Sequence, residues 1–121
     1  MCGTNHFDGQ ISTPAYLLNV DGSARSRPSI VAAPTATEPG AGIAVTTDRP
    51  VSRFSLVRAG AATHTIDNDQ RRIPLTITGT SGTAYQLAIP ADTGVVLPGD
   101  YLLFAIDSLG APSITAAVNI R

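Results

Sequence analysis

Few side chains in this sequence are suited to chemistry, and the most prominent is a histidine near the middle of the chain. His64 is one of two histidines among 121 residues, and neutral imidazole is a common ligand for copper and other transition metals. A structural metal site needs about four ligands. Cys2, His6 and His64 lie far apart, and no pair of potential ligands has the short spacing of a ligand motif. The sequence therefore predicts no complete metal site within this chain.

Other catalytic constellations give no signal. Serines are plentiful, but none lies in a Gly-x-Ser-x-Gly context, no glycine-rich phosphate loop precedes a helix, and tryptophan is absent. We identify no catalytic residue and no residue that would bind an organic cofactor. The net charge of -1 predicts no binding of nucleic acid or anionic membranes. No apolar run is long enough to span a bilayer.

The stretch around His64 favours a loop that reaches away from the scaffold. Slim residues from Gly60 to Thr63 precede the histidine, and a polar run from Asp67 to Arg72 follows it. Short polar side chains can bond to nearby backbone and brace the base of a loop, while a slim tip can enter a narrow space. A lone histidine in a β-loop is, however, more often a solvent-facing or hydrogen-bonded residue. Both interpretations stay open from the residues alone.

The elements that must position this loop are predicted to be β-strands. Hydrophobic residues make up 43% of the chain and charged residues 14%, and the rest is rich in Thr, Ser, Gly and Pro, which suits strands and turns. Period-2 alternation recurs, and no window shows a helical stripe. The expected strands cover residues 15–18, 28–32, 42–47, 53–58, 73–77, 85–89, 101–106 and 113–120. Seven or eight short antiparallel strands predict an all-β, immunoglobulin-like β-sandwich, a single domain over residues 1–121.

Three details of these strands are specific enough to test. Pro74 cannot donate to a ladder, so its strand is an edge at that point or begins after it. Residues 101–106 are apolar on both faces, which predicts a central strand that is covered on both sides, with Phe104 in the core. Tyr101 is placed to return its hydroxyl to nearby backbone, as in the tyrosine corner of immunoglobulin-like sandwiches.

The segment 63–76 contains the run T-H-T-x-x-x-D-Q-R-R-x-P-L. This run closely resembles the C-terminal early set, immunoglobulin-like domain of galactose oxidase and related copper radical oxidases. Residues 5–8, 97–104 and 110–113 are similar to other parts of the same domain, so the resemblance covers essentially the whole chain. It implies that the chain is the cap of a larger enzyme, which also has an N-terminal kelch-type propeller domain and oxidises an alcohol to an aldehyde while O2 is reduced to H2O2.

The resemblance also implies roles for individual residues. His64 would be one copper ligand, delivered by a long loop into the propeller, whose two tyrosines and second histidine complete the site. His6 corresponds to a histidine that is not a ligand, and Cys2 to a cysteine whose upstream disulfide partner is absent here. The isolated domain is expected to bind copper weakly and to oxidise nothing, and the expected location is secreted or extracellular. The alternative is a free-standing sandwich that serves as a binding or interaction module, for instance for carbohydrate.

Overall fold

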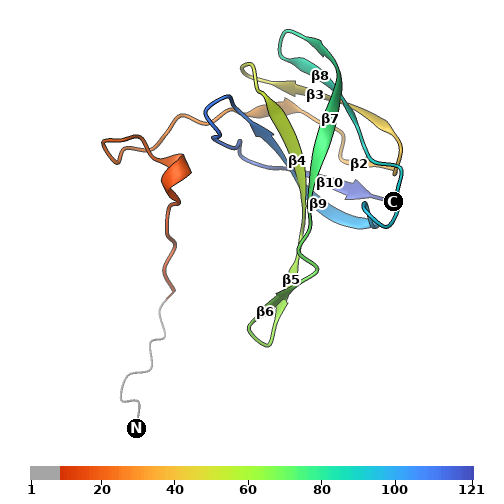
Figure 1. The fold of residues 1–121 in the computed structure, drawn as a ribbon, viewed down its shortest axis with the longest axis horizontal. Coiled ribbons are helices and arrows are strands. Elements are labelled where there is room, and N and C mark those ends of the chain that lie inside the picture. The colour runs from red at the N-terminus through yellow and green to blue at the C-terminus, as the bar shows by residue number, and fades with distance from the viewer. Residues whose placement is uncertain (1–8) are drawn as a thin grey trace.

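The computed structural model describes residues 9–121, which form a β-sandwich with one long hairpin extending from it (Figure 1). The elements are η1 (Ala15–Leu17), a 3-10 turn, and the strands β1 (Ile30–Ala32), β2 (Ala36–Thr37), β3 (Gly42–Thr47), β4 (Arg53–Arg58), β5 (Ala61–Thr63), β6 (Ile66–Asn68), β7 (Arg72–Ser81), β8 (Ala84–Ala88), β9 (Gly99–Ile106) and β10 (Ala116–Ile120). In this part of the chain no helix is long and apolar enough to cross a membrane. The all-β sandwich predicted from the sequence is confirmed.

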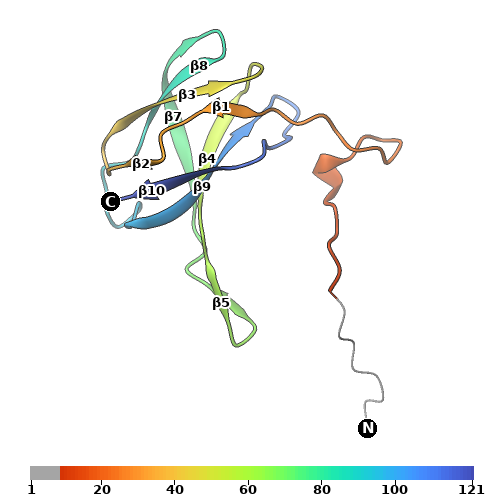
Figure 2. The same cartoon turned by 180° about the vertical axis from the view of Figure 1, so that it is seen from behind.

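Eight of the strands form one hydrogen-bonded network, in the order β1-β3-β8-β7-β4-β9-β10-β2, which folds over into two layers (Figures 1 and 2). Its pairings are antiparallel except that of β10 with β2. The long strand β7 belongs to both layers, because it pairs with β4 through residues 72–75 and with β8 through residues 76–81. β7 therefore links the layers, and β4 and β7 both lead directly into the extended hairpin.

Pro74 lies where β7 has a neighbour on one side only. It is opposite Ser55 of β4, whereas the pairing of β7 with β8 begins at Thr76. A strand tolerates proline where it needs no ladder donor on its second side. The prediction that the strand is an edge at this residue is confirmed, although β7 as a whole lies inside the network.

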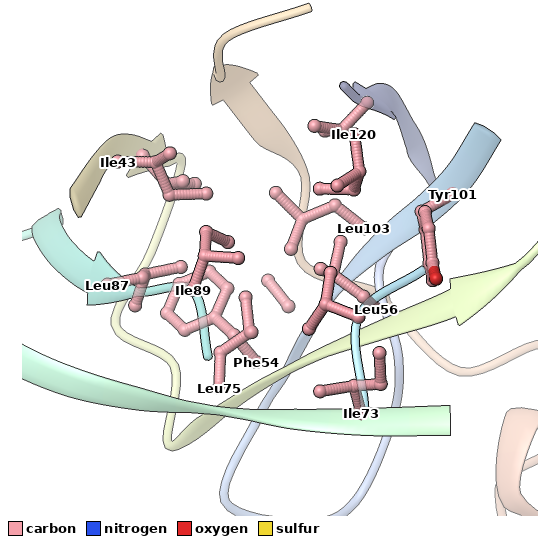
Figure 3. Close-up of a cluster of buried hydrophobic side chains, with 14 of the residues drawn as sticks. Ile43, Phe54, Leu56, Ile73, Leu75, Leu87, Ile89, Tyr101, Leu103 and Ile120 are labelled. Carbon is pink, nitrogen blue, oxygen red and sulfur yellow. The ribbon is translucent and has the colours of Figure 1, made fainter. Parts of the chain in front are cut away.

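The core lies between the two layers and is built by alternate residues of each strand. Phe54 and Leu56 of β4 are buried on one face. The Phe54 ring meets that of Tyr85, on β8, edge to face, with centroids 5.0 Å apart, a favourable aromatic geometry. Figure 3 shows the cluster, whose labelled members are Ile43, Phe54, Leu56, Ile73, Leu75, Leu87, Ile89, Tyr101, Leu103 and Ile120.

Two strand predictions at the ends of the chain need correction. Residues 15–18 were expected to be a strand, but residues 15–17 form η1, because the Leu17 and Leu18 amides donate back to Pro14 and Ala15. Residues 113–120 were expected to alternate throughout, but β10 begins at Ala116 and Ile114 is exposed.

The prediction for residues 101–106 was partly wrong. β9 is central, between β4 and β10, but only one of its faces is fully covered. Tyr101, Leu103 and Ala105 are buried, whereas Phe104 points to the other face and is only half-buried. Phe104 is therefore not a core residue within this chain.

Tyr101 behaves as the sequence predicts. Its side chain is fully buried, and its hydroxyl donates to the carbonyl oxygen of Leu97 at 2.9 Å. This bond ties the end of the 89–98 connection to the start of β9, close to the base of the extended hairpin.

Replacing Tyr101 by Phe should lower the free energy of unfolding by about 1–2 kcal/mol, because the Leu97 carbonyl loses its buried partner. Urea denaturation would measure the loss. The matched control is Tyr16→Phe, since the Tyr16 ring is 55% exposed, and it should leave stability unchanged. Equal stability of the Tyr101→Phe variant and the unaltered chain would contradict the prediction.

Candidate functional site

The residues between β4 and β7 form their own two-stranded sheet, here called the finger (residues 59–71). β5 pairs with β6 over three residues each, and only His64 and Thr65 connect them. The finger extends from one end of the sandwich (Figure 1), and every residue from 59 to 70 is exposed. The predicted loop is therefore a tight hairpin on a stem, and it places His64 at its tip.

The turn at the tip is strained. His64 and Thr65 have φ values of 53° and 64°, as in the two-residue turns that usually carry Asn-Gly. A side chain in this left-handed region costs roughly 1–2 kcal/mol, and a β-branched residue such as Thr is especially disfavoured there. Residues that break the local turn rule concentrate at functional sites. The turn thus indicates that its residues serve a purpose other than turning the chain.

The imidazole of His64 is held by the preceding residue. Its Nδ1 lies 2.8 Å from Thr63 Oγ1, and the Thr65 hydroxyl donates to the His64 carbonyl at 2.6 Å. With the proton on Nδ1, the ring donates to Thr63, and the Nε2 lone pair is left exposed at the tip. Hydrogen bonds of this kind fix the tautomer and ring orientation of metal-ligating histidines. In this structure the partner of the imidazole is thus the Thr63 hydroxyl.

Arg58, at the end of β4, anchors the base of the finger. Its Nε lies 2.8 Å from Asp69 Oδ2, and its guanidinium lies over the Tyr101 ring, 5.8 Å from the centroid. A Cβ added at Gly99 would come within 3.1 Å of Arg58 Nη2, so the glycine makes room for this arrangement. Arg58 could not be predicted from the sequence, because one arginine at a strand end carries no signal of its own.

Further contacts brace the finger from the polar run that follows His64. Gln70 donates to Asp67 Oδ2 at 2.8 Å, and Arg71 Nη1 donates to the carbonyls of Gly94 and Val95 at 3.1 and 3.0 Å. Gly60 leaves little room for a larger residue, since an added Cβ would come within 3.1 Å of the Asn68 carbonyl oxygen and would displace the Asp67 carboxylate. The predicted brace is present, but these bonds join side chains to one another and to a distant loop rather than to adjacent backbone.

His64 is a single donor rather than part of a complete site. Among residues 9–121 no three His, Cys, Asp or Glu side chains gather as a metal site within one chain would require. Cys2 and His6 lie outside the described residues. The pKa is lowered at Asp21, chiefly by the Ser23 hydroxyl, and at Asp48, chiefly by the Ser29 N–H, and neither is in the finger. An exposed, oriented imidazole fits one position of a copper site whose other ligands lie elsewhere.

Residues 27–120 match the family model described as "Galactose oxidase-like, Early set domain". The chain belongs to the galactose oxidase-like early set domain family. It is 46% identical over 120 residues to a galactose oxidase from Gibberella zeae and 45% identical to a second one from a strain of the same species. These matches cover 98% of this chain but only 18% of each relative.

A solved structure agrees with this assignment. The chain superposes with a TM-score of 0.83 and 35% identity on a fungal alcohol oxidase of the AA5 family in complex with copper, over 90% of this chain and 24% of that one. The resemblance stated from the sequence and the early set, immunoglobulin-like fold class are thereby confirmed. The early set domain described here corresponds to a small part of these larger oxidases.

Replacing Thr65 by Gly should stabilise the finger, because glycine adopts positive φ without a clash. Hydrogen exchange of the finger amides should slow about tenfold, which corresponds to the cost of one left-handed side chain. NMR-detected exchange would measure it. The control is Thr65→Ala, which removes the hydroxyl but keeps Cβ and should slow exchange much less. Equal slowing in the two variants would show that φ is not the cause.

Replacing Thr63 by Val removes the hydroxyl beside Nδ1 while the shape of the side chain is kept. The ring 15N shifts of His64 at alkaline pH should then move towards those of a free imidazole, because the Nδ1–H tautomer loses its acceptor. Thr63→Ser should retain the original shifts. Identical shifts in the unaltered chain and the Thr63→Val variant would contradict this role of Thr63.

Proposed function

We propose that this chain acts as the C-terminal cap of a copper radical oxidase of the galactose oxidase type and that His64 provides one copper ligand. The observation that carries the proposal is the finger: an exposed histidine on a strained turn, oriented by Thr63 and braced at its base by Arg58. Membership of the galactose oxidase-like family and the likeness to a copper-bound alcohol oxidase support it.

In this proposal the remaining ligands, two tyrosines and a histidine, come from an N-terminal kelch-type propeller. Copper and its tyrosyl radical, when bound, supply the two-electron oxidation of an alcohol to an aldehyde with reduction of O2 to H2O2. The residues of this chain bind and orient. His64 Nε2 binds the metal, Thr63 holds the Nδ1 proton, and the ion pair of Arg58 and Asp69 sets the direction of the finger. With one ligand, the isolated domain is inactive. The proposed location is secreted or extracellular.

The alternative of a carbohydrate-binding module has less support. Sugar recognition at a sandwich surface commonly uses exposed aromatic rings that stack on the sugar. Within residues 9–121, Tyr16 is the one aromatic side chain that is exposed, since Phe54, Tyr85 and Tyr101 are buried and Phe104 is half-buried. One exposed ring is weaker support for sugar binding than the strained, histidine-bearing turn is for metal binding. The metal-ligand role is therefore better founded.

Copper(II) titration of the isolated chain tests the donor. A Cys2→Ser background removes the thiol, and electron paramagnetic resonance with isothermal titration follows binding. Weak binding is expected, and His64→Ala should reduce the affinity at least about tenfold, in line with loss of the one imidazole ligand in the finger. The control His6→Ala should change little, and galactose should not be oxidised. Turnover by this chain alone would contradict the proposal.

A chimera tests the complete function. The Gibberella zeae galactose oxidase, with its C-terminal region exchanged for this chain, should bind copper tightly and oxidise its alcohol substrate. His64→Ala in the chimera should abolish both copper retention and oxidation, because no other imidazole of this domain lies at the finger tip. A His64→Ala chimera that keeps its copper and its activity would show that His64 is not a ligand.

A further inference from the structure

The outer face of the β4–β9 layer is apolar where a sandwich usually faces water. Sheets of this kind alternate apolar residues towards the core with polar residues outside. On β9, however, Leu102, Phe104 and Ile106 point away from the core and are only half-buried. Val57 of β4 lies on the same face and is also half-buried. β9 has the sequence of a strand that is covered on both faces, yet residues 9–121 fully cover only one of its faces.

A groove of about 400 Å³ lies on this face, here called the outer groove. Its floor is apolar, and its walls are formed by η1 and by the connection between β9 and β10. An arginine lies towards each end of the part of β4 that lines the groove. Its lining residues are Tyr16, Arg53, Ser55, Val57, Arg72, Phe104, Ile106, Gly110 and Pro112. The β4 register separates the arginines, because Arg53 is opposite Ile106 whereas Arg72 is opposite Val57.

Ser55 is the polar group left without a partner in this groove. The residue is 2% exposed, and its Oγ is buried and makes no hydrogen bond within the described part of the chain. A buried hydroxyl without a partner is unfavourable, and such groups in native structures call for an explanation. A ligand that seats an acceptor oxygen in the outer groove would satisfy it.

The two arginines of the groove also lack counterparts. Within residues 9–121, neither Arg53 nor Arg72 forms an ion pair or a side-chain hydrogen bond. The other arginines near this end are engaged, since Arg58 pairs with Asp69 and Arg71 binds two carbonyls. Guanidinium groups recognise carboxylates by charge-assisted hydrogen bonds. The charge and the donors of the outer groove therefore complement an acidic group at either end, above an apolar floor.

The outer groove continues towards the finger. A second hollow at the base of the finger shares Val57 and Arg72 with it and is otherwise lined by Arg58, Gly60, Asp67, Gln70 and Arg71. In Figures 1 and 2, the N-terminal arm that carries η1 and the finger extend towards the same end of the molecule. A body that received the finger would thus meet the outer groove as well.

We propose that the outer groove is the docking site for an acidic, apolar segment of the domain that receives the finger. An aromatic or aliphatic side chain of this segment lies on Phe104 and Ile106, and Asp or Glu carboxylates of it accept from Ser55 and from Arg53 or Arg72. This rests on the proposed function, because the occupant belongs to the partner domain. It agrees with the chain spanning only 18% of its Gibberella zeae relatives.

The first experiment tests the chemistry on the isolated chain. NMR titration with 3-phenylpropionate should shift the signals of Ser55 and Phe104, with an affinity at least fivefold higher than that of the neutral 3-phenylpropionamide. Arg53→Gln with Arg72→Gln should remove this preference, and the control Arg121→Gln should keep it. Equal binding of acid and amide, or none of the acid, would overturn the assignment of a carboxylate.

The second experiment tests the source of the carboxylate in the full-length chimera described above. Hydroxyl-radical labelling of Phe104 and Tyr16 should fall at least fivefold between the isolated chain and the chimera, while labelling of Val31, exposed on the other layer, should not change. Unchanged labelling of Phe104 would overturn the docking proposal, and the outer groove would then be a small-molecule site if the acid binds. Copper content of the same samples reports separately on His64, so the two proposals can fail independently.

Discussion

The contact of Arg58 with Asp69 and Tyr101 joins the finger to the sandwich. The guanidinium lies over the buried Tyr101 ring and pairs with Asp69 at 2.8 Å, so one side chain contacts both the core and the polar run after the hairpin. An isolated two-stranded hairpin is marginally stable in water, and every residue of the finger from 59 to 70 is exposed. Its direction in the free domain must therefore come from its base. Tyr101 is fixed in turn by its bond to Leu97, which makes this corner the support for everything beyond it.

The scaffold was largely predictable because its signals are local. The alternation in residues 42–47 and 53–58 matches β3 and β4, and the turn residues after residue 106 end β9 as expected. Pro74 correctly predicted that its strand has a free edge at that residue, because the missing N–H is a property of proline itself and needs no knowledge of the rest of the fold. η1 was missed, since a short apolar run fits a strand and a 3-10 turn equally well. β10 begins late because the Ser113 hydroxyl accepts from the Ala105 amide, a tertiary contact that no local pattern contains.

The site was predictable only in part. The family run singled out His64, whose role as a ligand stays a prediction, and neither the positive φ at the tip nor the Thr63 partner of Nδ1 follows from the sequence pattern. The strength of the brace depends on Arg58, whose partner Asp69 lies beyond the hairpin in the chain. The apolar outer face of β9 was visible in the sequence but was assigned to the core. An apolar pattern indicates that a strand face is covered, but it does not indicate which part of the protein covers it. The half-buried Phe104 corrects this assignment.

The two-residue turn at the tip has a consequence for how such a finger can change during evolution. Each added pair of facing residues lengthens the stem by about 3.3 Å and also turns the tip to the opposite face of the ribbon, because side chains alternate along a strand. Two added pairs restore the original facing at about 6.6 Å of extra reach. A single inserted residue would bulge the ribbon or shift its pairing. The reach of the finger is thus quantised, and under the proposed function a recipient domain of different thickness would have to match one of few permitted lengths.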